Sequence, residues 1–383
     1  INHSLLFNLL RCYIIICCWV AIHQVLLLRA QDTNVKTNLF CYHTKQCQHF
    51  HQRDDNNKLN YINHKLLDQR KSINNIEEME SSSGLNGLYR PRSALARAFY
   101  EKQRNDRHLQ EIDQNEWYRV EKSRLSPELN EKFVQLNADE ETKEFLSASI
   151  DKSSWVWTQI WYLLAKAVLR YFWSITDING WLGRGSMFVL SESQARSLLS
   201  AGRNKPLNGG SLVDVGAGDG EVSKRFANLY STKYATEISG SMRKALSTKG
   251  YTLLDTEDWW RGQQFDCVCM LNLLDRCSRP MTMLKQARTT LASGGVLLLA
   301  LVLPYKPYVE VTPDHKPEER LSIQGATFEE QAGSFVELMR DAGFELRSWS
   351  RAPYLCEGDF AQAYYWLDDS VFVFAPKSIQ PNA

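Results

Sequence analysis

The chain has 383 residues, enough for two or three domains at roughly 100–200 residues each. Its 45 basic and 44 acidic side chains leave a formal net charge of +1. Proteins that bind nucleic acid usually present a strongly basic face, so this balance argues against a nucleic-acid partner.

The first 78 residues differ in composition from the rest. They contain no methionine, and they hold six of the eight histidines and five of the nine cysteines. An apolar stretch at 12–28 is slightly shorter than the ~20 residues that a membrane-spanning helix needs. It is either a signal peptide or signal anchor, or upstream sequence outside the working protein, with Met79 as the natural start. We interpret residues 1–88 as a disordered or non-native segment.

Location and membrane association depend on that apolar stretch. If the segment is translated, we expect the endoplasmic reticulum, another endomembrane or the mitochondrion, and otherwise the cytoplasm. Cys41 and Cys47, with histidines nearby, match no zinc-ligand spacing, so we predict no metal site. We expect the protein to be a monomer.

Residues 89–200 are predicted to form a helical N-terminal extension or lid. Trp117, Tyr118 and Phe133 are candidate anchors on the main domain. Large apolar residues recur at helical spacing over 155–173, which favours a buried helix over one lying on a membrane surface. Glycines flank Arg184, so this segment is either a plain connector or a flap whose guanidinium meets a ligand carboxylate.

Residues 201–377 alternate between strand and helix patterns and form the predicted ligand-binding domain. The expected elements are strand 212–215, helix 222–229, strand 234–238, strand 251–254, strand 265–271, helix 281–291, strand 296–303, helix 328–342, strand 344–351 and strand 371–374. A loop is expected at 353–366. This order is typical of a three-layer α/β domain with a Rossmann-like sheet.

A glycine loop follows the first of these strands. Gly216, Gly218 and Gly220 come directly after Asp214 and Val215. Glycine allows positive φ and close approach of a ligand, and open α/β sheets bind ligands at the carboxyl ends of their strands. A dinucleotide site has its third glycine one residue later, and the acidic residues of this loop would repel a pyrophosphate. S-adenosylmethionine, with a cationic centre and an amino group, fits better; a plain turn is the alternative.

Three further polar residues are expected at the same edge. Glu237 lies near the end of the next strand, about twenty residues after the loop, where such folds bind ribose hydroxyls. The alternative is a solvated edge carboxylate. Asn272 and Asp275 follow the strand at 265–271. Cys267 and Cys269 within that strand are interpreted as structural thiols.

Several strings together resemble the DREV family of methyltransferases, which methylate the pros nitrogen of protein histidines. They are Asp214–Val222 with Ala235–Glu237, then 178–180, 182–189, 271–277, 300–304, 307–310 and 353–359. The resemblance covers about residues 115–376 and not 1–90. It implies a seven-stranded methyltransferase sheet, S-adenosylmethionine as cofactor and protein substrates containing His-x-His, with x small.

The resemblance also implies roles for individual residues. Glu237, Asn272 and Tyr354 would hold the cofactor above the loop at 214–220, and Asp275 would face the substrate imidazole. Neutral imidazole has a pKa near 6.5 and needs the right tautomer rather than a strong base. A carboxylate that accepts the tele N–H leaves the pros lone pair free, which suits Asp275; the alternative for Asp275 is a helix N-cap.

Other functions stay open on the sequence. A small-molecule methyltransferase would share the cofactor half and differ at Asp275 and the loop at 304–310. A scaffold would bind the cofactor without turnover. A dehydrogenase is disfavoured by the glycine spacing.

Overall fold

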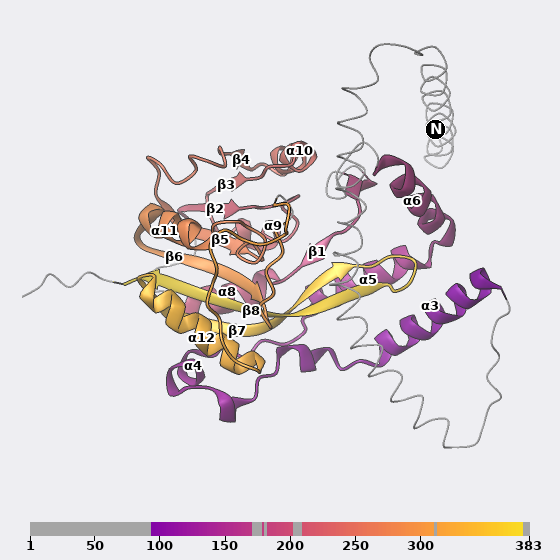
Figure 1. Ribbon diagram of the computed structural model, residues 1–383, viewed down its shortest axis with the longest axis horizontal. Coiled ribbons are helices and arrows are strands. Elements are labelled where there is room, and N and C mark those ends of the chain that lie inside the picture. The colour runs from indigo at the N-terminus through magenta and orange to yellow at the C-terminus, as the bar shows by residue number, and fades with distance from the viewer. Residues whose placement is uncertain (1–92, 171–177, 180–181, 202–208, 310–311, 378–383) are drawn as a thin grey trace, which may run out of the picture. The chain divides into compact units, whose positions relative to one another are not determined.

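The computed structural model describes residues 93–170, 178–179, 182–201, 209–309 and 312–377 (Figure 1). The chain divides into two units at Tyr89 and Arg90, and the second unit contains every described residue. The expectations for residues 1–88, including the apolar stretch at 12–28, therefore lie outside the described part. Within that part, no helix combines the length and apolarity needed to cross a membrane.

An α/β sheet organises the second unit, as predicted. It has eight strands in the order β1-β7-β8-β6-β5-β2-β3-β4 rather than the expected seven, because the two-residue β1 joins one edge. The strands are β1 (Met187–Phe188), β2 (Ser211–Val215), β3 (Thr232–Thr236), β4 (Thr252–Leu253), β5 (Phe265–Leu271), β6 (Leu291–Val302), β7 (Phe344–Glu357) and β8 (Tyr364–Pro376). Strands β2 to β6 pair in parallel, and β1, β7 and β8 pair antiparallel.

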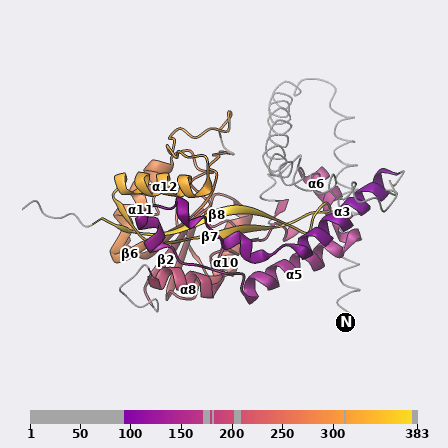
Figure 2. The same cartoon turned by 90° about the horizontal axis from the view of Figure 1, so that it is seen from below.

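Helices cover both faces of this sheet. The helical elements are α3 (Ala94–Glu111), η1 (Gln114–Tyr118), η2 (Lys122–Arg124), α4 (Pro127–Lys132), α5 (Glu140–Ser154), α6 (Val156–Leu169), α8 (Glu192–Ala201), α9 (Lys224–Ala227), α10 (Gly240–Thr248), α11 (Pro280–Thr290) and α12 (Phe328–Asp341). Figure 2 shows α12 and α8 on opposite sides of β7 and β8. Because β1 joins the sheet and α8 packs on β7, residues of the predicted extension at 89–200 contribute to the sheet layers.

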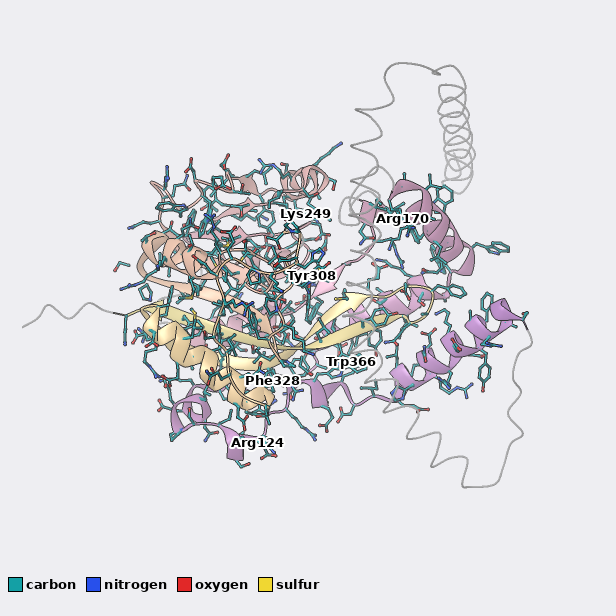
Figure 3. All side chains as sticks on the ribbon, viewed as in Figure 1. Arg124, Arg170, Lys249, Tyr308, Phe328 and Trp366 are labelled. Carbon is teal, nitrogen blue, oxygen red and sulfur yellow. The ribbon has the colours of Figure 1, made fainter. Side chains whose placement is uncertain are left out.

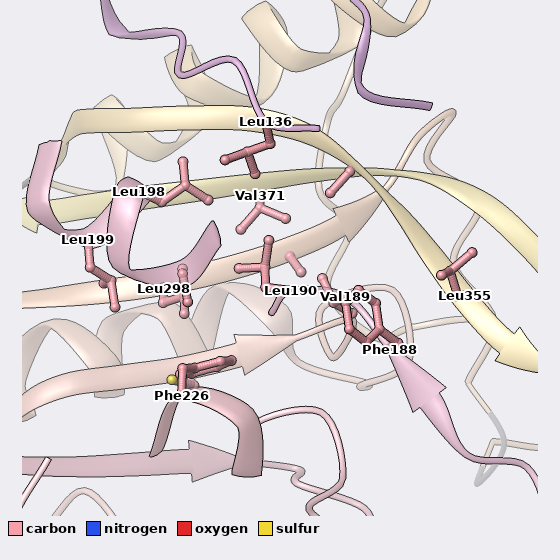
Figure 4. Close-up of a cluster of buried hydrophobic side chains, with 14 of the residues drawn as sticks. Leu136, Phe188, Val189, Leu190, Leu198, Leu199, Phe226, Leu298, Leu355 and Val371 are labelled. Atoms are coloured by element: carbon pink, nitrogen blue, oxygen red, sulfur yellow. The ribbon is translucent and has the colours of Figure 1, made fainter. Parts of the chain in front are cut away.

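Alternate residues of each central strand enter two different cores. In β5, Cys267 and Cys269 join the core under α8 and α9, whereas Val268 and Met270 join the core under α11 and α12. Figure 4 shows part of the first core, where Leu198 and Phe226 pack with Leu298 and Val371. The side chains on both faces of these strands are buried, which explains why the strands are continuous apolar runs. Each large apolar side chain contributes roughly 1.5–3 kcal/mol on burial.

The expected anchors of the N-terminal extension are confirmed. Trp117 and Tyr118 are buried, and the Trp117 ring lies 5.5 Å from that of Trp366. Phe133 packs edge-on against Trp349 at 5.1 Å, and the Trp349 indole donates to the Leu129 carbonyl at 2.7 Å. These contacts attach η1 and α4 to the long β7–β8 hairpin.

The expected burial of the apolar stripe over 155–173 is wrong at its first two tryptophans, whereas Trp161 is half-buried. Trp155 and Trp157 are 67% and 81% exposed, and Leu163 is also exposed. Among the α6 side chains that the structure describes, Gln159 and Ala165 are buried. Helical spacing locates an apolar stripe, but it cannot say whether a partner covers that stripe.

Two strands are longer than predicted. The expected loop at 353–366 is largely strand, since β7 continues to Glu357 and β8 begins at Tyr364. Residues 292–295, which lie between the helix and the strand expected there, belong to β6 at a register shift where Gly294 takes a φ of 75°. The helices predicted at 281–291 and 328–342 are confirmed to within a residue, whereas α9 covers only part of the helix expected at 222–229.

Candidate active site

The glycine loop lies at the carboxyl end of β2 and is tied to β3. Gly216 N–H donates to the Thr236 hydroxyl at 3.1 Å, and Ala217 N–H donates to the Thr236 carbonyl at 3.0 Å. A Cβ on Gly216 or Gly220 would lie 2.7 Å from a leucine methyl group, whereas a Cβ on Gly218 would meet nothing within 4 Å. The loop therefore packs closely at its two ends and leaves open space at its middle, as a ligand cradle requires.

Glu237 is held beside this cradle. Its Oε2 accepts from Gly218 N–H at 2.9 Å, and its Oε1 accepts from the N–H groups of Ile238 and Ser239, both at 2.8 Å. A carboxylate has about four lone-pair positions, so one on Oε2 stays available for a hydroxyl donor. Ile238, the next residue, is apolar and 79% exposed.

The three acidic residues of the loop region behave differently. Asp219 and Glu221, two of the acidic residues that argued for a cationic ligand, both pair with Lys249, which Figure 3 labels. The Lys249 ammonium lies 2.7 Å from Glu221 and 3.7 Å from Asp219. Asp214 is buried in β2, where it hydrogen-bonds Ser223. Its place beneath the loop supports the turn, and direct cofactor contact by Asp214 stays a prediction.

Asn272 begins the turn after β5. Its φ is 57°, its backbone N–H donates to the Ala300 carbonyl at 2.9 Å, and its side-chain amide donates to Asp369 Oδ2 at 2.9 Å. The Asn272 Oδ1 atom is buried and has no hydrogen-bond partner among the described residues. Asp369 was not identified from the sequence, because it lies 97 positions away in an antiparallel strand.

Asp275 is buried beside the same strand end. Its Oδ2 lies 3.2 Å from Arg276 Nε, and its Oδ1 has no hydrogen-bond partner within the described chain. The N-cap of α11 is Arg279, so the alternative role of Asp275 as that cap is wrong. The backbone carbonyl of Asp275 accepts from the N–H of Tyr308, which Figure 3 labels, at 2.8 Å. This bond ties the loop after β6 to the backbone of Asp275.

Two aromatic hydroxyls belong to this cluster. Burial, and then the charge of Asp275, raise the pKa of Tyr305, whose hydroxyl is buried without a described hydrogen-bond partner. Tyr354 is coupled electrostatically to Asp275 and Asp369, and its hydroxyl donates to Met187 Sδ. Asn272, Asp275, Tyr305, Tyr354 and Asp369 therefore lie in one neighbourhood, and the roles that the resemblance implies for Asn272, Asp275 and Tyr354 stay predictions.

Arg184 contacts a different part of the molecule. Its guanidinium pairs with the buried Glu357 at 2.6 Å, donates to the Gly358 carbonyl at 2.9 Å and lies over the Tyr162 ring. These contacts join α6 to the β7–β8 hairpin. A cofactor role for Arg184 stays a prediction.

Burial changes the ionisation of three carboxyls at this edge. Desolvation raises the pKa of Asp214 to about 7, against an opposing hydrogen bond from Ser223. It raises the pKa of Asp369 to about 8, and Asp275 adds to that increase. It also raises the pKa of Asp275, whereas Arg276 opposes the change. Buried carboxyls with unused oxygens provide acceptors for a ligand that brings donors and positive charge.

We expect the stability of the ligand-free protein to fall as pH rises from about 5 to 8. In this window unfolded carboxyls, with pKa near 3.9, are ionised, while folded Asp214 and Asp369 still bind protons. Each can therefore remove up to about 1.4 kcal/mol of unfolding free energy per pH unit. Carboxyls with a lowered pKa, such as Asp139, act only below about pH 4.5.

Urea unfolding at several pH values measures this effect. The variant Asp214→Asn should show a shallower decrease than wild type, and the exposed-site control Asp341→Asn should show the wild-type decrease. A wild-type unfolding free energy that rises or stays constant over this window would contradict the ionisation scheme.

No group of three or more histidine, cysteine or acidic side chains suited to a metal ion occurs in the described ranges. Cys267 and Cys269 are buried thiols outside any disulfide bond, and their sulfur atoms lie 3.8 Å apart. His315, one of two histidines after residue 78, stacks on Tyr308 at 4.7 Å.

Comparison with known proteins gives one family. A model described as DREV methyltransferase matches residues 117–376. Similar solved structures include a DhpI–SAH complex, with 16% identity over 49% of this chain and 85% of that chain and a TM-score of 0.32. Another is magnesium protoporphyrin IX methyltransferase from Synechocystis PCC 6803 with bound SAM. It is 19% identical over 45% of this chain and 72% of that chain, with a TM-score of 0.29. Similarities this low do not bear on substrate.

Proposed function

This chain belongs to the DREV methyltransferase family, and on that premise we propose that it transfers a methyl group from S-adenosylmethionine to the pros nitrogen of histidine in His-x-His segments of other proteins. One observation supports histidine as the methyl acceptor: Asp275 is a buried carboxyl at the strand ends, and one of its oxygens has no described hydrogen-bond partner.

The residues at the strand ends fit the cofactor. Glu237 has one free acceptor position for a ribose hydroxyl, Gly218 leaves space above the loop, and Asn272 presents an unpaired carbonyl oxygen. Strand β2 lies between β3 and β5, so Glu237 and Asn272 stand on opposite sides of the loop. The ribose would lie toward Glu237 and the amino-acid end toward Asn272. When bound, S-adenosylmethionine supplies an electrophilic methyl group on a sulfonium.

The chain's own residues would align the nucleophile. The free oxygen of Asp275 accepts the tele N–H of the substrate imidazole, which leaves the pros lone pair directed at the methyl group. Methylation makes the imidazole cationic, and the same carboxylate stabilises that charge. Burial raises the pKa of Asp275, and the Arg276 guanidinium beside it opposes that change and favours the ionised form that accepts this hydrogen bond. Exclusion of water by Tyr305 and Tyr354 strengthens these interactions.

Short peptides test the acceptor. We expect methylation of a peptide containing His-Ala-His, and no methylation when both histidines are alanine or when free histidine is supplied. Hydrolysis of the product and comparison with authentic standards should give pros-methylhistidine. Turnover of free metabolites but not peptides would favour a small-molecule methyltransferase instead. Cofactor binding without any turnover would favour a non-catalytic scaffold.

A further inference from the structure

Asp369 is a buried carboxyl in the middle of an antiparallel strand. It faces Val302 of β6 and Ala352 of β7 in the sheet register, and none of its surface is exposed. Placing a carboxyl in such a position costs several kcal/mol unless hydrogen bonds compensate it. Its described side-chain partner is the amide of Asn272, and the backbone groups of Ser370 and Leu301 also favour its ionised form. Its Oδ1 is buried with no hydrogen-bond partner in the described residues. Apolar packing alone would not select an acid here.

The bond to Asp369 fixes the orientation of the Asn272 amide. An amide side chain has a donor end and an acceptor end of nearly the same shape, so only its partners decide which end faces a ligand. Asp369 Oδ2 accepts from the Asn272 nitrogen at 2.9 Å, which leaves Oδ1 as the end that faces away from Asp369. When Asp369 is protonated, the same bond forms with the proton on Oδ1, because Oδ2 then still accepts from the Asn272 amide.

The backbone of Asn272 contributes to the same arrangement. Its φ of 57° is in the left-handed region, which asparagine tolerates better than most residues, and its N–H is bound to the Ala300 carbonyl. The main chain therefore brings the amide toward β8, where Asp369 meets it. Both the strained turn and the buried acid serve one result, which is a carbonyl oxygen held at the strand end without a partner.

We propose that Asp369 is a positioning residue for the cofactor: it holds the Asn272 amide so that the carbonyl oxygen accepts from the ammonium group at the amino-acid end of S-adenosylmethionine. The ammonium is the donor-rich end of that molecule, and the buried Asn272 carbonyl oxygen without a described partner is an acceptor for it. The inference rests on the proposed cofactor and not on the proposed histidine acceptor.

Calorimetric binding of two ligands to the purified protein tests the idea without turnover. S-adenosylhomocysteine carries the amino-acid end, whereas 5′-methylthioadenosine lacks it. We expect Asp369→Leu to weaken binding of S-adenosylhomocysteine at least tenfold and to leave 5′-methylthioadenosine within twofold of wild type. Asp369→Asn keeps an oxygen that can accept from Asn272, so it should stay within threefold of wild type for both ligands.

Matched variants separate positioning from folding. Asp368→Leu removes the neighbouring carboxyl, which pairs with Arg351 at 2.7 Å, and should leave both affinities within twofold. Asn272→Gly should reproduce the selective loss at a backbone conformation that glycine accepts, and adding Asp369→Leu to it should cause no further loss. If Asp369→Leu does not fold, normal binding of S-adenosylhomocysteine by Asn272→Gly would still overturn the proposal.

Several results would overturn the proposal. They are normal binding of S-adenosylhomocysteine by folded Asp369→Leu or by Asn272→Gly, equal loss of both ligands, or a loss in Asp369→Asn as large as in Asp369→Leu. Failure of wild type to bind S-adenosylhomocysteine would instead refute the proposed cofactor.

Discussion

Replacing Asp275 by asparagine should reduce peptide methylation at least about 100-fold while leaving cofactor affinity within threefold of wild type. Arg276 Nε lies 3.2 Å from Asp275 Oδ2 and would hold the oxygen of an asparagine there, so the amide nitrogen would face the substrate. A donor at that position stabilises the tautomer that carries its proton on the pros nitrogen, and the nucleophilic lone pair is lost. The charge that forms on the imidazole also loses its counter-ion.

Initial rates with a His-Ala-His peptide and saturating S-adenosylmethionine measure this change. Asp341→Asn, an exposed substitution at the end of α12, is the control and should be indistinguishable from wild type. Because the variant removes a buried carboxyl, its unfolding midpoint should not fall. A folded Asp275→Asn enzyme that methylates the peptide at the wild-type rate would refute the role of Asp275.

Replacing Glu237 by alanine should weaken cofactor binding by about 10- to 100-fold. The carboxylate supports the loop through Gly218 N–H and Ser239 N–H and has one lone pair left for a ribose hydroxyl. The substitution therefore removes a charge-assisted ligand bond and loosens the cradle at once. Since the ribose is common to both probe ligands, S-adenosylhomocysteine and 5′-methylthioadenosine should weaken together, in contrast to the selective loss at Asp369.

Calorimetry with the two ligands gives both affinities. Glu131→Ala, an exposed substitution in α4, should leave them unchanged. Retention of 5′-methylthioadenosine binding by Glu237→Ala would place the ribose elsewhere and contradict the orientation of the cofactor across β2.

Local chemistry made much of the site predictable. The strand at 265–271 and the helix at 328–342 follow from apolar periodicity, because each buries its apolar residues against a sheet face whatever the rest of the chain does. The glycine loop was also predictable from local residues, because three of its five positions have positive φ and therefore favour glycine. The roles of Asp219 and Glu221 were not, because Lys249 lies about 30 residues downstream.

The sequence by itself determined a methyltransferase sheet, the position of its glycine loop and the identity of Glu237, Asn272 and Asp275 as the polar residues at the strand ends. These depend on contacts between near neighbours and on the fixed geometry of parallel strands. Only the tertiary structure decided that Asp369 reaches Asn272, that β7 continues past Pro353, and that Trp155 and Trp157 are exposed. Each of these depends on which distant segments meet, and side-chain spacing along one segment carries no information about its partner.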